Sequence, residues 1–343
     1  MLASMIEEIR LRKSYLGDLP LESIYLGGGS PSLLQESDLA SLLNEINKNF
    51  VLNDPEITLE ANPDDLSKDK LQSLKSLGIN RLSIGVQSFR DEDLKLFNRA
   101  HTAHMALQCL NDSKAAGFEN ITMDLIYGIP GLSLKAWKKN LDTFFEFNLP
   151  HLSAYALTYE EKTAFGHWIK KGKLIPSDEN LVIDQFKMLM EMASKNGFEH
   201  YEISNFAQNH LYAKHNTSYW KGDEYLGIGP SAHSYDGATR CWNVANNSTY
   251  LRNIKNGDIN IENEKLSKTD KLNEYIMTSL RTMWGLDLSY VKRNFGSKEK
   301  GNLILEANPY IQDKSILIQD DLLLLSEKGK LVADKITSDL FQV

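Results

Sequence analysis

The sequence predicts an α/β fold with a parallel sheet, and three observations support this prediction. Helix and strand patterns alternate through residues 1–205. The same helix–glycine–strand junction occurs three times. Each predicted strand is followed directly by glycine or by a polar residue. The first two observations indicate repeated βα units, and the third indicates a ligand site at one rim of the sheet.

Short β-rich runs and amphipathic helical stretches follow one another in turn. Apolar residues recur at helical spacing in the longer stretches, and β-branched and aromatic residues fill the shorter ones. The predicted strands are residues 23–26, 56–60, 81–86, 120–125, 151–155 and 200–203. The predicted helices are residues 6–15, 38–50, 68–77, 104–116, 134–147 and 178–196.

The recurring junction places a glycine between a helix and the next strand. The glycines are Gly78, Gly117 and Gly197, and each is followed by an apolar residue. Glycine adopts the left-handed conformation that ends a helix at little cost, and the following apolar residue packs back on that helix. Three separate loops therefore favour the same βα interpretation.

Composition changes divide the chain into three predicted parts. Residues 1–205 form the βα region, 206–264 are loop-rich and aromatic, and 265–343 form a small helical, winged-helix-like domain. Helices are expected at 272–283 and 290–295, with a small hairpin near 322–325 and a last helix at 331–341. A capping domain is expected rather than a DNA-binding wing, because the chain is acidic.

Charge and composition limit the function classes. The net charge is −8 and the sequence pI is about 5.6, which argues against a general nucleic-acid-binding protein. Two cysteines in 343 residues do not make a disulfide scaffold and suit a reducing compartment. No run of 18 apolar residues and no signal peptide are recognisable, so a cytoplasmic protein that does not span a membrane is expected.

Polar residues gather at the predicted carboxyl ends of the strands, where a β/α barrel holds its active site. Gly28, Gly29 and Ser30 follow the first strand, Glu60 ends the second, Gln87 follows the third and Asp124 lies in the fourth. Ordinary turn residues remain the alternative, because Gly, Pro and Asn favour loops in any case.

The triple glycine at 27–29 lets a ligand approach the backbone and offers N–H donors. It matches neither the dinucleotide fingerprint nor the P-loop, and it indicates an anionic or carboxylate-bearing ligand. Glu60 could bind an amine or a ribose hydroxyl, or simply lie at the surface. Arg99 could pair with a ligand carboxylate, or form a salt bridge at a helix end.

Six ordered segments resemble the radical-SAM family of oxygen-independent coproporphyrinogen III oxidase. They are residues 27–34 (GGGSPSLL), 60–63 (EANP), 83–89 (SIGVQSF), 124–131 (DLIYGIPG), 201–207 (YEISNFA) and 215–220 (HNTSYW). The last is similar to the His-Asn-x-x-Tyr-Trp signature of the haem chaperone branch, and residues 227–234 (GIGPSAHS) follow at the spacing expected there.

The resemblance implies a partial (β/α)6 TIM-like radical-SAM barrel that lacks its first strand. It implies S-adenosylmethionine and a [4Fe–4S] cluster as cofactors. Gly28, Gly29 and Ser30 would line the amino-acid end of S-adenosylmethionine. The resemblance also assigns S-adenosylmethionine contacts to four further positions, which are Glu60, Gln87, Arg99 and Asp124.

The chain departs from this family at the cluster. Members carry Cys-x₃-Cys-x₂-Cys ahead of the triple glycine, and three thiolates leave one iron open for S-adenosylmethionine. Here the first cysteine is Cys109, within a predicted helix, and Cys241 lies far along the chain. Both are expected to be structural, so no metal site and no cluster are expected in this chain. Some thirty to forty N-terminal residues are expected to be missing, by the family pattern.

The aromatic segment is the second candidate site. By the branch resemblance, His215, Asn216, Tyr219 and Trp220 form a haem or substrate segment whose chemical role the residues alone do not give. An imidazole can ligate iron and aromatic faces can pack on a porphyrin, although a lone histidine usually serves as a hydrogen-bonding residue.

Three functions stay open. The first, favoured by the signature, is a chaperone that binds haem as cargo and delivers it to haem proteins, which could include membrane-associated ones. The second is the oxidase itself, acting in porphyrin biosynthesis. The third is a cluster-free barrel that binds S-adenosylmethionine or another metabolite. Whether the chain is an enzyme is left open, and reductive cleavage of S-adenosylmethionine is not expected.

Overall fold

The computed structural model describes residues 1–259 and 261–342. Asn260, in the predicted segment 206–264, and Val343, at the end of the predicted C-terminal domain, lie outside the described residues. None of the described helices is both long and apolar enough to cross a membrane.

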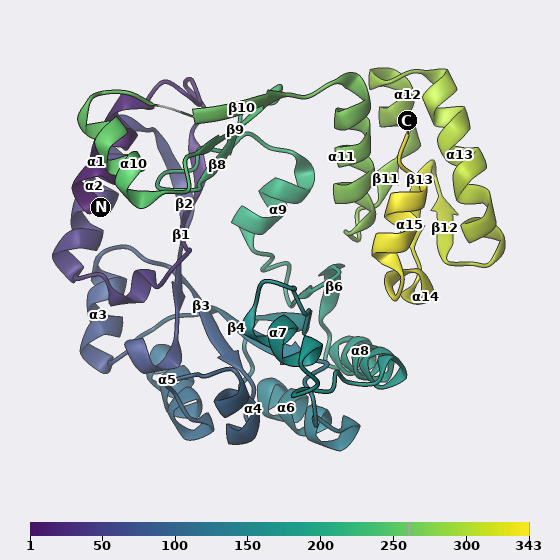
Figure 1. Ribbon diagram of the computed structural model, residues 1–343, viewed down its shortest axis with the longest axis horizontal. Helices are drawn as coiled ribbons and strands as arrows, with labels where there is room; N and C mark the ends of the chain where they lie inside the picture. The colour runs from purple at the N-terminus through teal and green to yellow at the C-terminus, as the bar shows by residue number, and fades with distance from the viewer. Residues whose placement is uncertain (260, 343) are drawn as a thin grey trace. The chain divides into compact units, whose positions relative to one another are not determined.

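A seven-stranded sheet with the order β1-β2-β3-β4-β5-β7-β6 forms the centre of the βα region (Figure 1). Its pairs β2·β3, β3·β4 and β4·β5 are parallel, which confirms the predicted α/β barrel-type fold. The strands are β1 (Leu21–Leu26), β2 (Leu52–Ala61), β3 (Arg81–Gln87), β4 (Asn120–Tyr127), β5 (His151–Ala156), β6 (Glu199–Glu202) and β7 (Asn205–Ala207).

Strand β7 was not expected, because the predicted strand in this region ends at residue 203. It pairs antiparallel with both β5 and β6 and lies between them. All three of its residues are buried. A strand of three residues is too short for its period to be recognised in a sequence, so only tertiary pairing reveals it.

The connections between the strands of this sheet contain helices. These helices include α3 (Lys68–Ser76), α4 (Asp91–Leu96), α5 (Ala103–Ala115), α6 (Leu134–Glu146), α7 (Ala164–Lys170) and α8 (Glu179–Lys195). Leu59, Leu82, Ile84, Ile121 and Met123 on three neighbouring strands are fully buried. Burial of such side chains stabilises the layer by about 1.5–3 kcal/mol each.

The three glycine junctions end their helices as expected. Gly78, Gly117 and Gly197 have φ of +90°, +84° and +75°. The next N–H bonds back into the helix, at 3.1 Å from Ile79 to the Leu74 carbonyl and at 3.2 Å from Phe118 to that of Ser113. This is the Schellman arrangement, which brings each strand back onto the sheet.

The chain divides into two compact units that do not follow chain order. One contains residues 25–34 and 56–212, with most of the large sheet. The other contains residues 1–24, 35–55 and 213–343. The second unit includes α1 (Leu2–Leu11) and α2 (Glu36–Asn49), and α1 begins four residues earlier than the predicted helix at 6–15.

The predicted loop-rich segment contains regular structure. It comprises α9 (Lys214–Lys221), α10 (Asn247–Lys255) and a sheet of order β10-β9-β8, with β8 (His233–Tyr235), β9 (Thr239–Asn243) and β10 (Ile261–Lys265). The C-terminal part adds a second small sheet of order β11-β13-β12. Its strands are β11 (Leu286–Asp287), β12 (Ile316–Gln319) and β13 (Leu322–Leu325).

The C-terminal part contains five described helices, of which three overlap the expected ones and two, α13 and α14, were not expected. They are α11 (Lys268–Leu280), α12 (Leu288–Asn294), α13 (Ser297–Gln312), α14 (Glu327–Lys330) and α15 (Ala333–Asp339). Helix α13 was not foreseen, because Gly301 and Pro309 inside it are helix breakers by propensity. Tertiary packing of Leu303 and Ala307, both fully buried, overrides that propensity.

Candidate functional site

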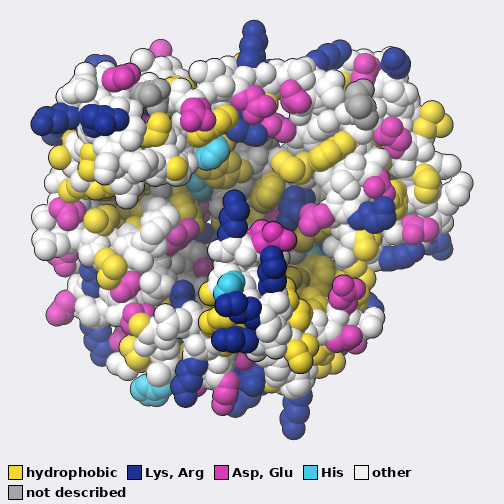
Figure 2. Space-filling view, in the orientation of Figure 1, with side chains coloured by type: hydrophobic (Ala, Val, Ile, Leu, Met, Phe, Trp, Pro, Cys, Tyr) yellow, Lys and Arg dark blue, Asp and Glu magenta, His cyan; other side chains and the backbone are white. Residues whose placement is uncertain are grey.

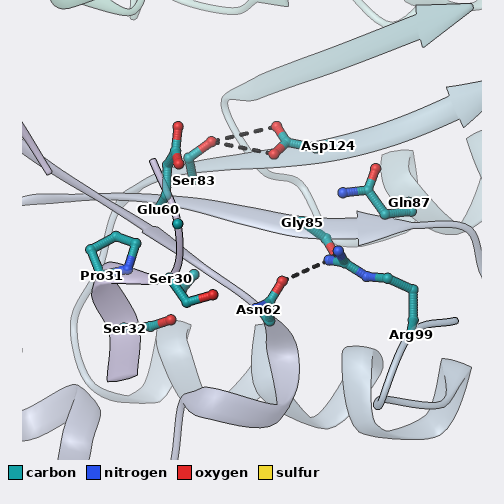
Figure 3. Close-up of a pocket in the computed structure, with 12 residues that line it drawn as sticks. Ser30, Pro31, Ser32, Glu60, Asn62, Ser83, Gly85, Gln87, Arg99 and Asp124 are labelled. Carbon is teal, nitrogen blue, oxygen red and sulfur yellow. Dashed lines mark hydrogen bonds between the residues drawn. The ribbon is translucent and has the colours of Figure 1, made fainter. Parts of the chain in front are cut away.

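A hollow of about 210 Å³ lies at the carboxyl ends of neighbouring strands of the large sheet (Figure 3). Its walls come from the turn after β1, from the last residues of β2 and the turn that follows, from β3 and β4, and from Arg99 between α4 and α5, so residues distant in sequence meet here. The lining residues are Gly29, Ser30, Pro31, Ser32, Glu60, Ala61, Asn62, Ser83, Gly85, Gln87, Arg99 and Asp124. Six of the seven predicted cofactor-binding residues are among them.

Gly28, the seventh, lies beside the hollow and helps to hold Glu60. Its N–H donates to Glu60 Oε2 at 3.1 Å, and the Tyr25 hydroxyl donates to Oε1 at 2.6 Å. Gly28 and Gly29 have φ of +74° and +65°, a region that glycine adopts without strain. The glycine-rich turn therefore orients the carboxylate of Glu60 as well as exposing its own backbone.

Arg99 and Gln87 form the opposite wall. Arg99 Nη2 donates to Asn62 Oδ1 at 2.8 Å and to the Gly85 carbonyl at 2.7 Å. A Cβ at Gly85 would lie 2.9 Å from both Arg99 Nη2 and Gln87 Nε2, so a side chain there would displace the ends of these two side chains. Burial lowers the pKa of the guanidinium, and nearby aspartates, Asp64 first, oppose that shift.

Gln87 has a left-handed backbone, with φ of +68°, which is uncommon outside glycine. Three buried side chains hold the turn that follows it. Ser88 Oγ donates to Asp93 Oδ2 at 2.6 Å and accepts from Asn140 Nδ2 at 3.1 Å, and Asn140 Oδ1 accepts from the Phe89 N–H at 3.2 Å. Sequence reasoning missed Asp93 and Asn140. Each is a polar residue on the buried face of its helix, and that pattern could have indicated a buried hydrogen-bonding role.

Asp124 lies opposite Glu60 in the hollow. Ser83 Oγ is 3.4 and 3.5 Å from its two carboxylate oxygens. Burial, and then the neighbouring charge of Glu60, raise the pKa of Asp124 to about 7. Two carboxyl groups in one hollow, one of which takes up a proton near neutral pH, can both accept from and donate to a bound ligand.

A second buried polar network crosses the sheet in the same unit. Arg81 donates to Thr122 Oγ1, which is 3.1 Å from His151 Nδ1, and His151 Nε2 is 2.7 Å from the Tyr201 hydroxyl. Burial lowers the pKa of His151 well below its usual value, with the positive charge of Arg81 acting in the same direction. These residues connect four strands and were not singled out from the sequence.

The four residues of the predicted haem segment lie together on α9 and none lines the hollow. His215 Nδ1 is 3.1 Å from Ser23 Oγ, and its ring meets that of Tyr219 edge-on with centroids 5.0 Å apart. The guanidinium of Arg281 lies 5.5 Å from the ring centroid of Trp220. Asn216 is half-buried on the same helix.

The described residues contain no group of three or more His, Cys, Asp or Glu side chains that could hold a metal ion. Cys109 and Cys241 are both buried and belong to different compact units. Burial raises the pKa of the Cys109 thiol to about 12, which disfavours the thiolate that metals require. The cysteines present therefore do not fit an iron–sulfur cluster.

Comparisons with known proteins agree on one family. The family model of the radical SAM superfamily matches residues 5–144. The haem chaperone HemW of Bacillus subtilis is 32% identical over 93% of this chain and 85% of its own length. HemW of Lactococcus lactis is 37% identical over 80% of this chain and 73% of its own length.

One solved structure resembles almost the whole chain. Coproporphyrinogen III oxidase (HemN) from Escherichia coli aligns with a TM-score of 0.84 over 99% of this chain and 82% of its own chain, at 22% sequence identity. At this level of identity the likeness concerns the fold alone.

Proposed function

Because the chain belongs to the radical-SAM superfamily and, within it, to the haem chaperone HemW family, we propose that it binds haem and delivers it to haem proteins. The observation that carries this proposal is the 32% identity to Bacillus subtilis HemW over 85% of that protein. The proposed acceptors are haem proteins of the cytoplasm or its membrane.

We assign the predicted haem segment on α9 to the cargo. Helix α9 carries His215 and Tyr219 in edge-on contact, and Tyr219 in turn meets Tyr225 with ring centroids 4.5 Å apart. Tyr219 is 39% exposed, so the aromatic group is accessible to a flat, largely apolar ligand. Imidazole and aromatic rings together suit an iron porphyrin.

The hollow of the large sheet is proposed to hold S-adenosylmethionine. That ligand presents an ammonium group, a carboxylate and ribose hydroxyls. Glu60 and Asp124 offer carboxylate oxygens for the amine or hydroxyls, and Arg99 offers a cation for the carboxylate. The bare backbone at Gly28 and Gly29 leaves room for the ligand to approach.

Cys109 and Cys241, the cysteines of this chain, do not fit the cluster that radical chemistry needs. A second candidate function follows from that observation: binding of S-adenosylmethionine without its reductive cleavage. In both candidates the hollow binds the ligand through this chain's own carboxylates and guanidinium. Only the first candidate requires haem.

The test is a titration of the 343-residue chain with ferric haem, followed by absorbance in the Soret region. The expected result is a saturable Soret shift with one haem per chain, and a weaker shift in His215→Ala. Titration that shows only the linear, unsaturated response of haem in buffer would contradict the haem chaperone proposal and leave the second candidate.

A further inference from the structure

An exposed connecting segment joins β5 to α8 in the unit that contains most of the large sheet. Residues 157–178 form it, and they include the short helix α7, none of whose residues is buried. Two side-chain contacts hold this connecting segment against the rest of the unit. The Tyr159 hydroxyl donates to the Gly128 carbonyl at 3.4 Å, and the Phe165 ring meets Phe97 edge-on with centroids 5.9 Å apart.

Capping interactions fix both ends of helix α7. Thr163 Oγ1 accepts from the Gly166 N–H at 3.2 Å and caps the start. Gly172 has φ of +65°, and the Lys173 N–H bonds to the Trp168 carbonyl at 2.8 Å, which ends the helix in a Schellman motif. The side chains on its outer face are therefore held at helical spacing.

That outer face presents an imidazole, an indole and an ammonium group side by side. His167, Trp168 and Lys171 are all exposed, and Lys171 follows the other two by four and three residues. Positions at these spacings are neighbours on a helix surface. Phe165 supports Trp168 from the inner side, with ring centroids 5.5 Å apart.

Lysines gather in the helical part of this segment, and acidic residues, Glu160, Glu161 and Asp178, lie at its two ends. Lys162, Lys170, Lys171 and Lys173 lie between residues 162 and 177 without an acidic residue, whereas the chain as a whole carries −8. In Figure 2, Lys and Arg side chains and a histidine gather over α7 near the middle of the lower half of the face. A further large apolar side chain, Ile175, is 82% exposed next to this cluster.

A ligand that contacts all of these groups at once would contain iron for the imidazole, a flat apolar ring for the indole and carboxylates for the ammonium groups. We propose that the outer face of α7 is a second haem contact surface, with His167 as an iron ligand, Trp168 against the porphyrin and Lys170 and Lys171 opposite its propionates. This inference rests on the proposed function. It adds a haem site in the compact unit that does not contain α9. An anionic membrane would use the lysines and Trp168 but leave His167 without a role.

The test titrates the full chain with ferric haem and, separately, with metal-free protoporphyrin IX. His167→Ala is expected to weaken ferric haem binding about tenfold, which corresponds to 1.4 kcal/mol, and to leave protoporphyrin binding unchanged. The pair Lys170→Ser and Lys171→Ser is expected to weaken both ligands, because both carry the propionates. His104→Ala replaces another exposed histidine, on α5; it is the matched control and is expected to bind both ligands normally.

Two results would overturn the inference. In the first, His167→Ala and the lysine pair bind both ligands like the unsubstituted chain, while His215→Ala loses haem; the haem chaperone proposal would then stand without this surface. In the second, the lysine pair keeps its haem affinity but loses binding to anionic phosphatidylglycerol vesicles, which would assign the face to a membrane. No haem binding by the unsubstituted chain would contradict the proposed function as well. His104, His167, Lys170 and Lys171 are exposed, so thermal unfolding of these variants is expected to be unchanged.

Discussion

At the scale of single residues, Asp124 determines a pH dependence that can be measured without knowing the ligand. Its pKa is about 7 in the folded chain and about 3.9 in an unfolded chain. Between these values the folded state binds more protons than the unfolded state, so stability falls as pH rises through this window. Asparagine has nearly the same shape and cannot ionise.

Asp124→Asn is therefore expected to raise the free energy of unfolding at pH 8 by about 1–3 kcal/mol and to change it little at pH 4. Urea unfolding at the two pH values measures this. The matched control is Asp142→Asn on the exposed face of α6, where the carboxylate bonds Lys138 at 2.8 Å and the substitution should slightly destabilise. An equal gain at pH 4 and pH 8 would show that ionisation of Asp124 is not the cause.

Gly85 gives a second prediction at this scale. The methyl group in Gly85→Ala would displace the ends of Arg99 and Gln87, which are flexible side chains rather than backbone. We expect S-adenosylmethionine affinity, measured by calorimetry, to fall about tenfold, with only a small loss of stability. Gly301→Ala in α13, where a Cβ meets nothing, is the control and should gain about 0.5–1 kcal/mol. Unchanged affinity in Gly85→Ala would place the ligand elsewhere.

At the scale of elements, one buried carboxylate docks α1 on the rest of its unit. Glu8 Oε1 accepts from Arg12 at 3.2 Å and from Asn243 at 2.7 Å, while Oε2 accepts from the Gly229 N–H and the Tyr250 hydroxyl. Glu8 is fully buried, so its removal leaves Arg12 as an uncompensated buried charge.

Glu8→Ala is expected to cost about 3–5 kcal/mol of stability. Chemical denaturation of the full chain measures this, with Glu7→Ala as the control, because Glu7 lies on the same helix and is half exposed. The exposed pair of Glu7 and Arg10 should contribute less than about 1 kcal/mol. Similar losses in both variants would argue against the buried network as the anchor of α1.

The elements that the sequence predicted correctly are those with long periodic patterns. Helices α5, α6 and α8 and strands β3 to β5 were expected within a few residues of their positions. The missed elements have physical reasons. Strand β7 is too short for a period, α13 contains Gly301 and Pro309, and the polar composition of residues 214–221 concealed α9.

The candidate site was predicted from the rule that parallel strands present their carboxyl ends at one rim. That rule collects Glu60, Gln87 and Asp124, and the fold brings them into one hollow. The rule does not identify a glycine within a strand or a residue on a helix. Gly85 lies in the interior of β3 and Asn140 on the buried face of α6, and both matter through three-dimensional contacts alone. The assignment of these residues to S-adenosylmethionine stays a prediction.

At the scale of the whole molecule, the cysteine content predicts the absence of radical chemistry from this polypeptide. Cys109 and Cys241 lie in different units and are buried. After anaerobic reconstitution with iron and sulfide and addition of dithionite, the 343-residue chain is expected to form no 5′-deoxyadenosine above background. A family member that carries Cys-x₃-Cys-x₂-Cys, treated in parallel, controls for the reconstitution. Product from this chain would require an iron site that its described residues do not form.

The central claim, that this chain carries haem to other proteins, is tested most directly by transfer. The chain is loaded with ferric haem, freed of excess and mixed with an apo haem enzyme whose activity returns on haem uptake. We predict that activity returns in proportion to the loaded chain and faster than from the same amount of haem held by serum albumin. Recovery no faster than from albumin, or none at all, would contradict the account.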